Sequence, residues 1–244
     1  MSVDGIALEF QHLPGDTTKP TLVLLHEGMG CIELWRDFPQ QLAAATGRSV
    51  FAYSRMGYGG SAPVHLPRPL DYMRIEAVEV LPALLKIARI STYTLVGHSD
   101  GASIALTYAG QIYDRGLQSI VIFAPHVFAE RCAIESIELV NEAFATSDLR
   151  QRLIKYHKAN ADGAFRGWCD SWINPRFRQW SIESDLAGIV VPVLQIQGRD
   201  DQYGTLDQLQ RIKRGVAAGV ETLVLDNCGH SPHLKRIPET LAAI

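Results

Sequence analysis

The stretch that decides the fold is Thr92–Gly110, TYTLVGHSDGASIALTYAG, with Gly97-His98-Ser99-Asp100-Gly101 at its centre. Apolar residues typical of a strand precede this pentapeptide and a helix-like segment follows it, so the sequence predicts a strand, a tight turn and a helix. Glycines are expected where a side chain would collide with neighbouring backbone, which leaves Ser99 at the tip of a strained turn. Free N–H groups at the start of the helix would face an oxyanion. The pattern indicates a nucleophilic serine.

A serine hydroxyl becomes a good nucleophile when a base removes its proton, so a histidine has to lie within reach of Ser99. Among the eight histidines we favour His230, because the segment NCGHSPH (227–233) follows the last predicted strand and would emerge at the same edge of the sheet. His233 is the alternative base. His98 is expected to pack beneath the turn. Three further histidines are expected at the surface: His12, His65 and His157.

A carboxylate is needed to fix the tautomer of the base and to stabilise the imidazolium that forms during attack. The segment GRDD (198–201) ends another predicted strand and offers two candidates. We predict Asp201 and keep Asp200 as the alternative, because the residues alone do not show which side chain faces inward.

Six apolar runs alternate with helical stretches, which predicts an α/β fold with a mostly parallel central sheet flanked by helices. The runs are continuous, so we expect strands that are buried on both faces. They are Thr21–Leu25, Ser49–Tyr53, Thr92–Val96, Ser119–Phe123, Val191–Ile196 and Glu221–Leu225. Amphipathic helices are predicted over Leu34–Ala45 and Ile75–Ala88, and Ile6–His12 is a candidate edge strand.

The alternation breaks between Phe123 and Val191, a gap far longer than the single helix that usually links two parallel strands. Helix-like stretches at Ile134–Phe144 and Leu149–Lys158 are followed by a tract rich in aromatic residues. We predict a small helical cap at 126–180, inserted into a core formed by 1–125 and 181–244.

The composition is that of an ordinary globular protein, with 47% hydrophobic and 20% charged residues among 244 and a formal net charge of −3. No long run of one charge sign is present, so we predict binding to neither nucleic acid nor membranes and expect a small-molecule substrate. Four separated cysteines without a CxxC pair, and no HExxH motif, predict no metal and no cofactor.

The first residues lack a secretory signal and no apolar stretch is long enough to span a bilayer, so a cytoplasmic protein is expected, as a monomer or homodimer. The chain ends at Ile244 inside its last expected helix, which leaves open whether that helix is complete.

Five segments resemble, in order, the signature stretches of the α/β-hydrolase superfamily. They are LLHEGMG (24–30), YSRMGYGGS (53–61), LVGHSDGAS (95–103), LQIQGRDDQYGT (194–205) and NCGHSPH (227–233). The resemblance covers nearly the whole chain and implies a nucleophile elbow at Ser99, with the cap placed after the sixth strand of that fold. It also implies a triad in the order Ser99, Asp201, His230, with the aspartate at the last position of the family's G-x-x-D motif.

The resemblance implies hydrolysis of a small ester, thioester or lactone through an acyl-enzyme. Relatives on the same fold cleave carbon–carbon bonds in dienoic ring-cleavage products, and the fold can also serve as a non-catalytic receptor for a small ligand. Both remain alternatives, because a shared fold does not identify the reaction.

The loop after the first buried strand departs from the family, which usually has glycine where this chain has Glu27. The first oxyanion donor is therefore the N–H of either Gly28 or Met29, and the second is the N–H of Asp100. A carboxylate aimed at an oxyanion would oppose it, so we expect Glu27 to point away, toward solvent or Arg55.

Side chains from the cap and the strand ends are expected to contact the substrate. Trp168 and Trp172 would form an apolar wall, and Arg176 would pair with a substrate carboxylate. The alternative is that these residues form the core of the cap and its surface. The candidates are His126, Trp168, Trp172, Arg176 and Tyr203.

Overall fold

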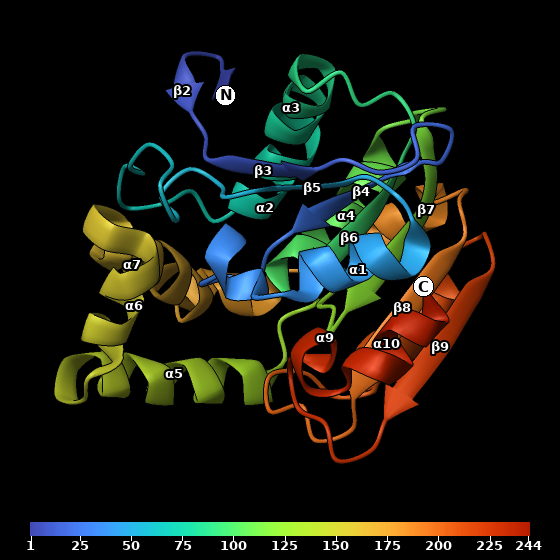
Figure 1. Cartoon of the computed structure of the whole chain (residues 1–244). Coiled ribbons are helices and arrows are strands. Elements are labelled where there is room, and N and C mark those ends of the chain that lie inside the picture. Colours follow the sequence, from blue (N-terminus) through green and yellow to red (C-terminus); the bar gives the residue numbers. More distant parts are fainter.

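Seven strands form one sheet in the computed structural model, which describes residues 1–244 (Figure 1). The strand order is β3-β5-β4-β6-β7-β8-β9, with β3 antiparallel to β5 and all other neighbours parallel. The predicted α/β fold is thereby confirmed. The strands are β3 (Phe10–Leu13), β4 (Thr21–Leu25), β5 (Val50–Tyr53), β6 (Tyr93–His98), β7 (Leu117–Phe123), β8 (Val193–Gly198) and β9 (Val220–Leu225), and a separate pair precedes them, β1 (Ser2–Val3) and β2 (Ile6–Ala7).

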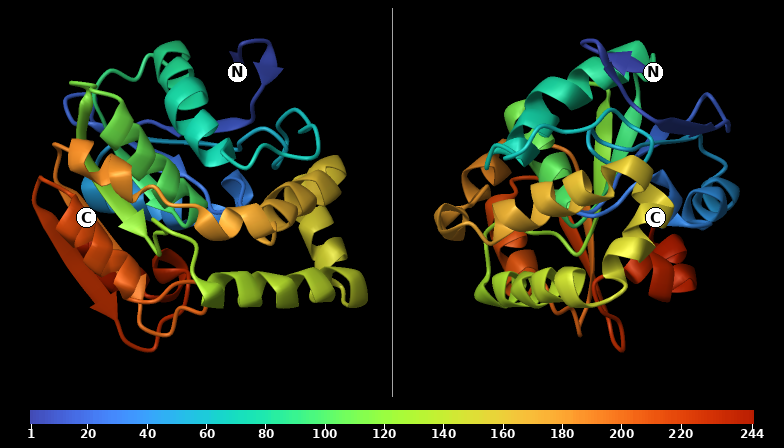
Figure 2. Two further views of the ribbon diagram at one scale, coloured as in Figure 1. Left: turned by 180° about the vertical axis from the view of Figure 1, so that it is seen from behind. Right: turned by 90° about the vertical axis from the view of Figure 1, so that its left-hand side faces the viewer.

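Helices cover both faces of the sheet, as the two views of Figure 2 show. On one face η1 (Ile32–Trp35), α1 (Phe38–Thr46), α9 (Pro232–Lys235) and α10 (Ile237–Ala243) pack over the strands. The other face carries α2 (Tyr72–Ile75), η2 (Glu76–Val80), α3 (Leu81–Ile87), α4 (Asp100–Gln111), η5 (Glu183–Gly188) and α8 (Asp207–Gly215).

Between β7 and β8 the chain forms α5 (Arg131–Thr146), α6 (Leu149–His157), η3 (Lys158–Asn160), α7 (Ala161–Trp172) and η4 (Pro175–Gln179). Helices α5, α6 and α7 gather at one end of the molecule, beyond the sheet (Figures 1 and 2). This group stands over the ends of the strands that carry the candidate site residues.

Two predicted helices are divided, and a proline lies at each division. Leu34–Ala45 was expected as one helix, but Pro39 lacks an N–H and fits only a first helical turn, so η1 ends at Trp35 and α1 begins at Phe38. The second predicted helix contains a π-helical turn, η2, directly before α3, where Pro82 cannot donate a backbone bond.

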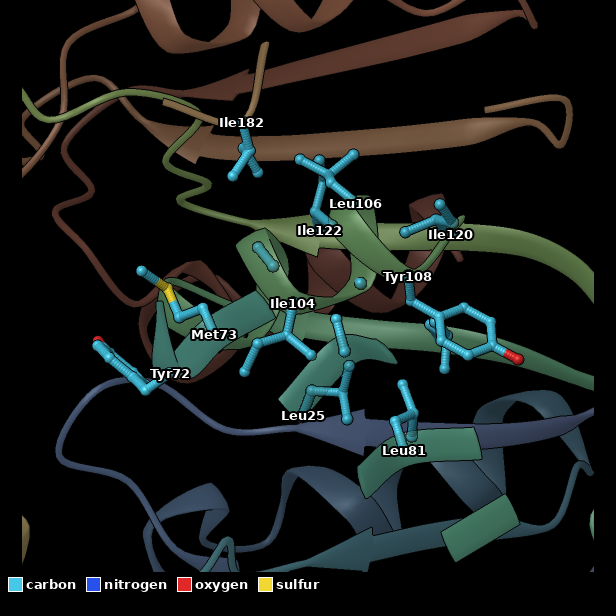
Figure 3. Close-up of a cluster of buried hydrophobic side chains, with 14 of the residues drawn as sticks. Leu25, Tyr72, Met73, Leu81, Ile104, Leu106, Tyr108, Ile120, Ile122 and Ile182 are labelled. Carbon is cyan, nitrogen blue, oxygen red and sulfur yellow. The ribbon is translucent and has the colours of Figure 1, made fainter. Parts of the chain in front are cut away.

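The core is densely built around α4, which is buried along ten consecutive residues from Asp100 to Ala109. Figure 3 shows side chains of α4, among them Ile104 and Leu106, in one cluster with Leu25 of β4 and Ile122 of β7. Strand β9 departs from the expectation of burial on both faces, because it lies at the sheet edge and only Leu225 is buried. No helix combines the length and apolar character that crossing a membrane requires.

Candidate active site

Ser99 lies between β6 and α4 in a conformation that side chains rarely adopt, with φ 54° and ψ −117°. Its N–H donates to the carbonyl of Phe123 on the neighbouring strand, at 2.9 Å, which ties the turn to the sheet. A non-glycine residue at positive φ costs roughly 1–3 kcal/mol and persists only where the surroundings impose it. This backbone strain places the serine side chain at the strand-to-helix turn, as the sequence predicts.

The two glycines of the turn allow close backbone packing. A Cβ at Gly97 would collide with the carbonyl of Gly101, and a Cβ at Gly101 would collide with the carbonyl of Leu25 at the end of β4. The turn is thus pressed directly onto the loop that follows β4.

We expect Gly101→Ala to destabilise the protein by about 2–3 kcal/mol, because an added methyl has to displace backbone. For a chain of this size that corresponds to a fall in Tm of about 5–10 °C, measurable by differential scanning calorimetry. Gly219→Ala is the matched control, since nothing lies within 4 Å of its Cβ position. Equal Tm values for the two variants would contradict the close packing.

His230 and Asp201 form a hydrogen-bonded pair, with Nδ1 of the histidine 2.9 Å from each carboxylate oxygen. The Asp201 side chain is only 1% exposed and also accepts a bond from the N–H of Tyr203 at 2.9 Å. Burial raises the pKa of Asp201, but the hydrogen bond and charge of His230 more than offset it, so the pKa lies below its ordinary value. The carboxylate is therefore ionised at neutral pH and accepts a hydrogen bond from the Nδ1–H of the imidazole.

The two alternatives from sequence lie elsewhere. Asp200 is exposed and its N–H donates to the carbonyl of Cys228. His233 is 1% exposed and packs among aromatic rings, with ring centroids 4.9 Å from Trp35 and 5.3 Å from Phe123. Burial keeps the pKa of His233 well below its ordinary value. Asp201 and not Asp200 pairs with the imidazole of His230, and His233 makes no hydrogen bond to either aspartate.

Ser99 and His230 line the same cavity, whose volume is about 190 Å³. Its walls come from the loop after β4, from the elbow, and from α5, α6 and α7. The other lining residues are Glu27, Gly28, Met29, Leu34, Asp100, His126, Ala133, Ile137, Leu153, Trp168, Trp172 and Tyr203. The cavity is small and its lining is mostly apolar, with a few polar side chains.

Four of the five predicted substrate contacts line this cavity: His126, Trp168, Trp172 and Tyr203. Arg176 does not, which corrects the prediction. It lies in η4, where the chain turns back after α7, and its exposed side chain borders a different surface hollow. The ring of Trp168 occupies the space where a Cβ of Gly28 would lie, so glycine is required in this loop.

The loop after β4 is held from beneath by a buried arginine. The guanidinium of Arg55 donates to the carbonyls of His26 and Glu27, at 2.5 and 2.9 Å. Neither the N–H of Gly28 nor that of Met29 donates a hydrogen bond within the protein, so both remain candidates for the first oxyanion donor.

His157 corrects a second prediction, because it is fully buried rather than at the surface. From the end of α6 its Nε2–H donates to the carbonyl of Met29 at 3.0 Å, and its Nδ1 accepts from the N–H of Gly59 at 3.0 Å. It joins the helices at 126–180 to the loop that carries the oxyanion candidates. It is the last residue of α6, a helix rich in charged side chains, so its position gave no signal of burial.

Glu27 also differs from expectation, since its partly buried carboxylate contacts the ring of His98 and not the Arg55 guanidinium. Its Oε2 lies 3.3 Å from Nδ1 of His98. Burial raises the pKa of Glu27, but the hydrogen bond and charge of His98 outweigh it, so the pKa lies below its ordinary value. The carboxylate is thus directed toward the elbow.

Two further residues on the cavity wall are deeply buried. His126 is 2% exposed, stacks edge-on against Trp172 with centroids 5.3 Å apart, and burial lowers its pKa to about 3, so it is neutral. The carboxyl of Asp100 is fully buried and accepts a hydrogen bond from Tyr72, and its burial raises its pKa. Tyr72 was not singled out from sequence, because a tyrosine 28 residues away carries no motif.

Comparisons with known proteins identify the family and the fold of this chain. The family described as "Alpha/beta hydrolase family" matches residues 22–243. A proline iminopeptidase from Levilactobacillus brevis is 31% identical over 159 residues, which are 64% of this chain and 50% of that protein. A 2-succinyl-6-hydroxy-2,4-cyclohexadiene-1-carboxylate synthase from Salmonella paratyphi C is 33% identical over 119 residues, 49% of this chain and 44% of that protein. The chain therefore spans about half the length of these relatives.

Solved structures share the fold at low identity. The proline iminopeptidase of Mycobacterium smegmatis has a TM-score of 0.74 at 18% identity and covers 99% of this chain and 94% of its own. The enol-lactonase of Burkholderia xenovorans LB400 has a TM-score of 0.73 at 19% identity, covering 98% and 95%. An esterase from Exiguobacterium antarcticum has a TM-score of 0.76 at 18% identity, covering 98% and 94%.

Proposed function

The chain belongs to the alpha/beta hydrolase family, and from that premise we propose that it hydrolyses small esters, thioesters or lactones with Ser99, His230 and Asp201 as its triad. The observation that carries the proposal is that His230, which is paired with Asp201, and the strained Ser99 border one small cavity. Residues 126–180 act as its cap, because Ile137, Leu153, Trp168 and Trp172 line the cavity from that segment.

The proposed reaction has two halves. His230 Nε2 takes the proton of Ser99 Oγ as the oxygen attacks the substrate carbonyl, and the ion pair with Asp201 stabilises the imidazolium. The N–H of Asp100, at the start of α4, and that of Gly28 or Met29 donate to the oxyanion. The leaving alkoxide takes the proton from His230, and water then attacks the acyl-enzyme with the same histidine as base.

The lining of the cavity favours an uncharged acyl group. Glu27 and Asp100 are the acidic side chains at its wall, and neither lysine nor arginine is among the lining residues. A substrate carboxylate would meet like charge without a cation to balance it. This favours ester or lactone hydrolysis over cleavage of dienoic acids, and the volume of about 190 Å³ favours a short acyl chain.

A fluorophosphonate probe tests the proposal, because it reacts with an activated serine. We expect one equivalent to attach to Ser99 and labelling to fall sharply in His230→Ala. An unlabelled but folded protein that binds a small ligand would instead favour a receptor on this fold.

Substrate charge gives a second test. We expect p-nitrophenyl butyrate to be hydrolysed with a kcat/KM about 10-fold or more above that of the p-nitrophenyl monoester of succinate, since the latter adds a carboxylate of similar length. Steady-state kinetics at constant ionic strength measures the ratio. Preference for the charged ester, or turnover of a ring-cleavage dienoate alone, would overturn the proposed substrate class.

A further inference from the structure

Both ring nitrogens of His98 face oxygen atoms. Nε2 lies 2.8 Å from the carbonyl oxygen of His230, and Nδ1 lies 3.3 Å from Oε2 of Glu27. A carbonyl oxygen only accepts, so Nε2 carries a proton. The contact between Nδ1 and the carboxyl is then a hydrogen bond only if a second proton lies on one of these two atoms. Glu27 therefore faces the one ring nitrogen of His98 that the carbonyl of His230 leaves free.

This pair connects the three loops of the proposed site. Glu27 immediately precedes the oxyanion candidates Gly28 and Met29, His98 immediately precedes Ser99, and the carbonyl that accepts from His98 belongs to His230 itself. The His98 side chain is 3% exposed, whereas that of Glu27 is 26% exposed. The buried His98 thus holds the backbone carbonyl of His230 through Nε2, while the carboxylate of Glu27 contacts Nδ1 on the other side of the same ring.

We propose that Glu27 is a positioning residue, which acts through His98 to hold the backbone of His230 and the oxyanion loop in register with Ser99; this rests on the function proposed above. It explains why a carboxylate occupies a loop position where the resembled family usually has glycine. Without a partner for Nδ1, the imidazole of His98 loses one of the two contacts that fix its orientation, and its bond to the His230 carbonyl is weakened.

The surroundings of His98 place no other carboxylate against its ring. Rings of His230 and His233 lie 5.0 and 4.6 Å away, and Trp35 lies 6.3 Å away, between centroids. Burial keeps His233 neutral. The titratable and charged groups that face the pair are Arg55, His126, His157, His230 and His233.

Three variants separate positioning from packing. In Glu27→Gln the amide N–H donates to Nδ1, so the chain of bonds is complete with a singly protonated ring. In Glu27→Ala the partner of Nδ1 is lost. Glu33→Gln changes an exposed carboxylate of η1 outside the site and serves as the control.

We expect Glu27→Ala to lower kcat for a neutral ester about 10- to 100-fold, with KM within about 2-fold, because a small misplacement of the base is costly. Glu27→Gln should retain kcat near the wild-type value at pH 7.

The experiment is a measurement of kcat and KM at pH 7 for the wild type and the three variants, together with fluorophosphonate labelling and Tm. If the wild type labels at Ser99 but Glu27→Ala keeps full kcat, or Glu27→Gln loses as much kcat as Glu27→Ala, the positioning role is wrong and the proposed function stands. If the wild type neither labels nor turns over any ester, both fail together.

Discussion

Replacing Ser99 with alanine is expected to lower kcat by about 10⁵- to 10⁶-fold, because removing the nucleophile of a triad removes nearly all of the covalent route. Weak turnover from the oxyanion donors and substrate binding should remain. The variant should fold normally, since alanine at this strained position needs no new contact. Steady-state and single-turnover kinetics with p-nitrophenyl butyrate measure the loss.

Ser91→Ala is the matched control, because Ser91 is an exposed serine just before β6. It should keep both activity and labelling. If Ser99→Ala retained more than about a hundredth of the wild-type kcat with an unchanged Tm, the hydroxyl would not be the nucleophile.

Replacing Asp201 with asparagine is the second large effect, with an expected fall in kcat of about 10⁴-fold. The carboxylate accepts the Nδ1 proton of His230 through both of its oxygens, each at 2.9 Å. An amide offers an N–H to the same nitrogen and favours the tautomer that has its proton on Nε2, where the lone pair is needed to accept from serine. KM should change far less than kcat.

Asp200→Asn separates this effect from a general change of charge in the turn. Asp200 is the adjacent residue, exposed and not bonded to the imidazole, so its variant should keep kcat within about 2-fold of the wild type. Comparable losses of kcat in the two variants would show that Asp201 does not orient His230, and the base would then need another partner.

The fold was predictable because its signals are local and repeated. Each buried strand is a continuous apolar run, and the elbow combines a strand, two glycines and a helix within 19 residues. The pairing of Asp201 with His230 could be predicted because β8 and β9 are parallel neighbours, so the loops that follow them lie at one edge of the sheet.

The predictions that failed concerned the direction of single side chains, which the hydrophobic periodicity of a sequence does not indicate. Arg176 lies four residues from Trp172, yet the turn at Pro175 carries it to the outside while Trp172 lines the cavity. His157 looks like a surface histidine in a charged helix, but its two bonds bury it against the oxyanion loop. Glu27 has its partner 71 residues away, in the elbow itself.

The most direct test of the proposed site is a crystal structure of the protein after reaction with a small fluorophosphonate. We expect phosphorus bonded to Ser99 Oγ, a phosphoryl oxygen within hydrogen-bond distance of the N–H of Asp100 and of either Gly28 or Met29, and His230 Nε2 facing Oγ. Phosphorus on any other residue, or a phosphoryl oxygen turned away from these amides with His230 out of reach, would contradict it.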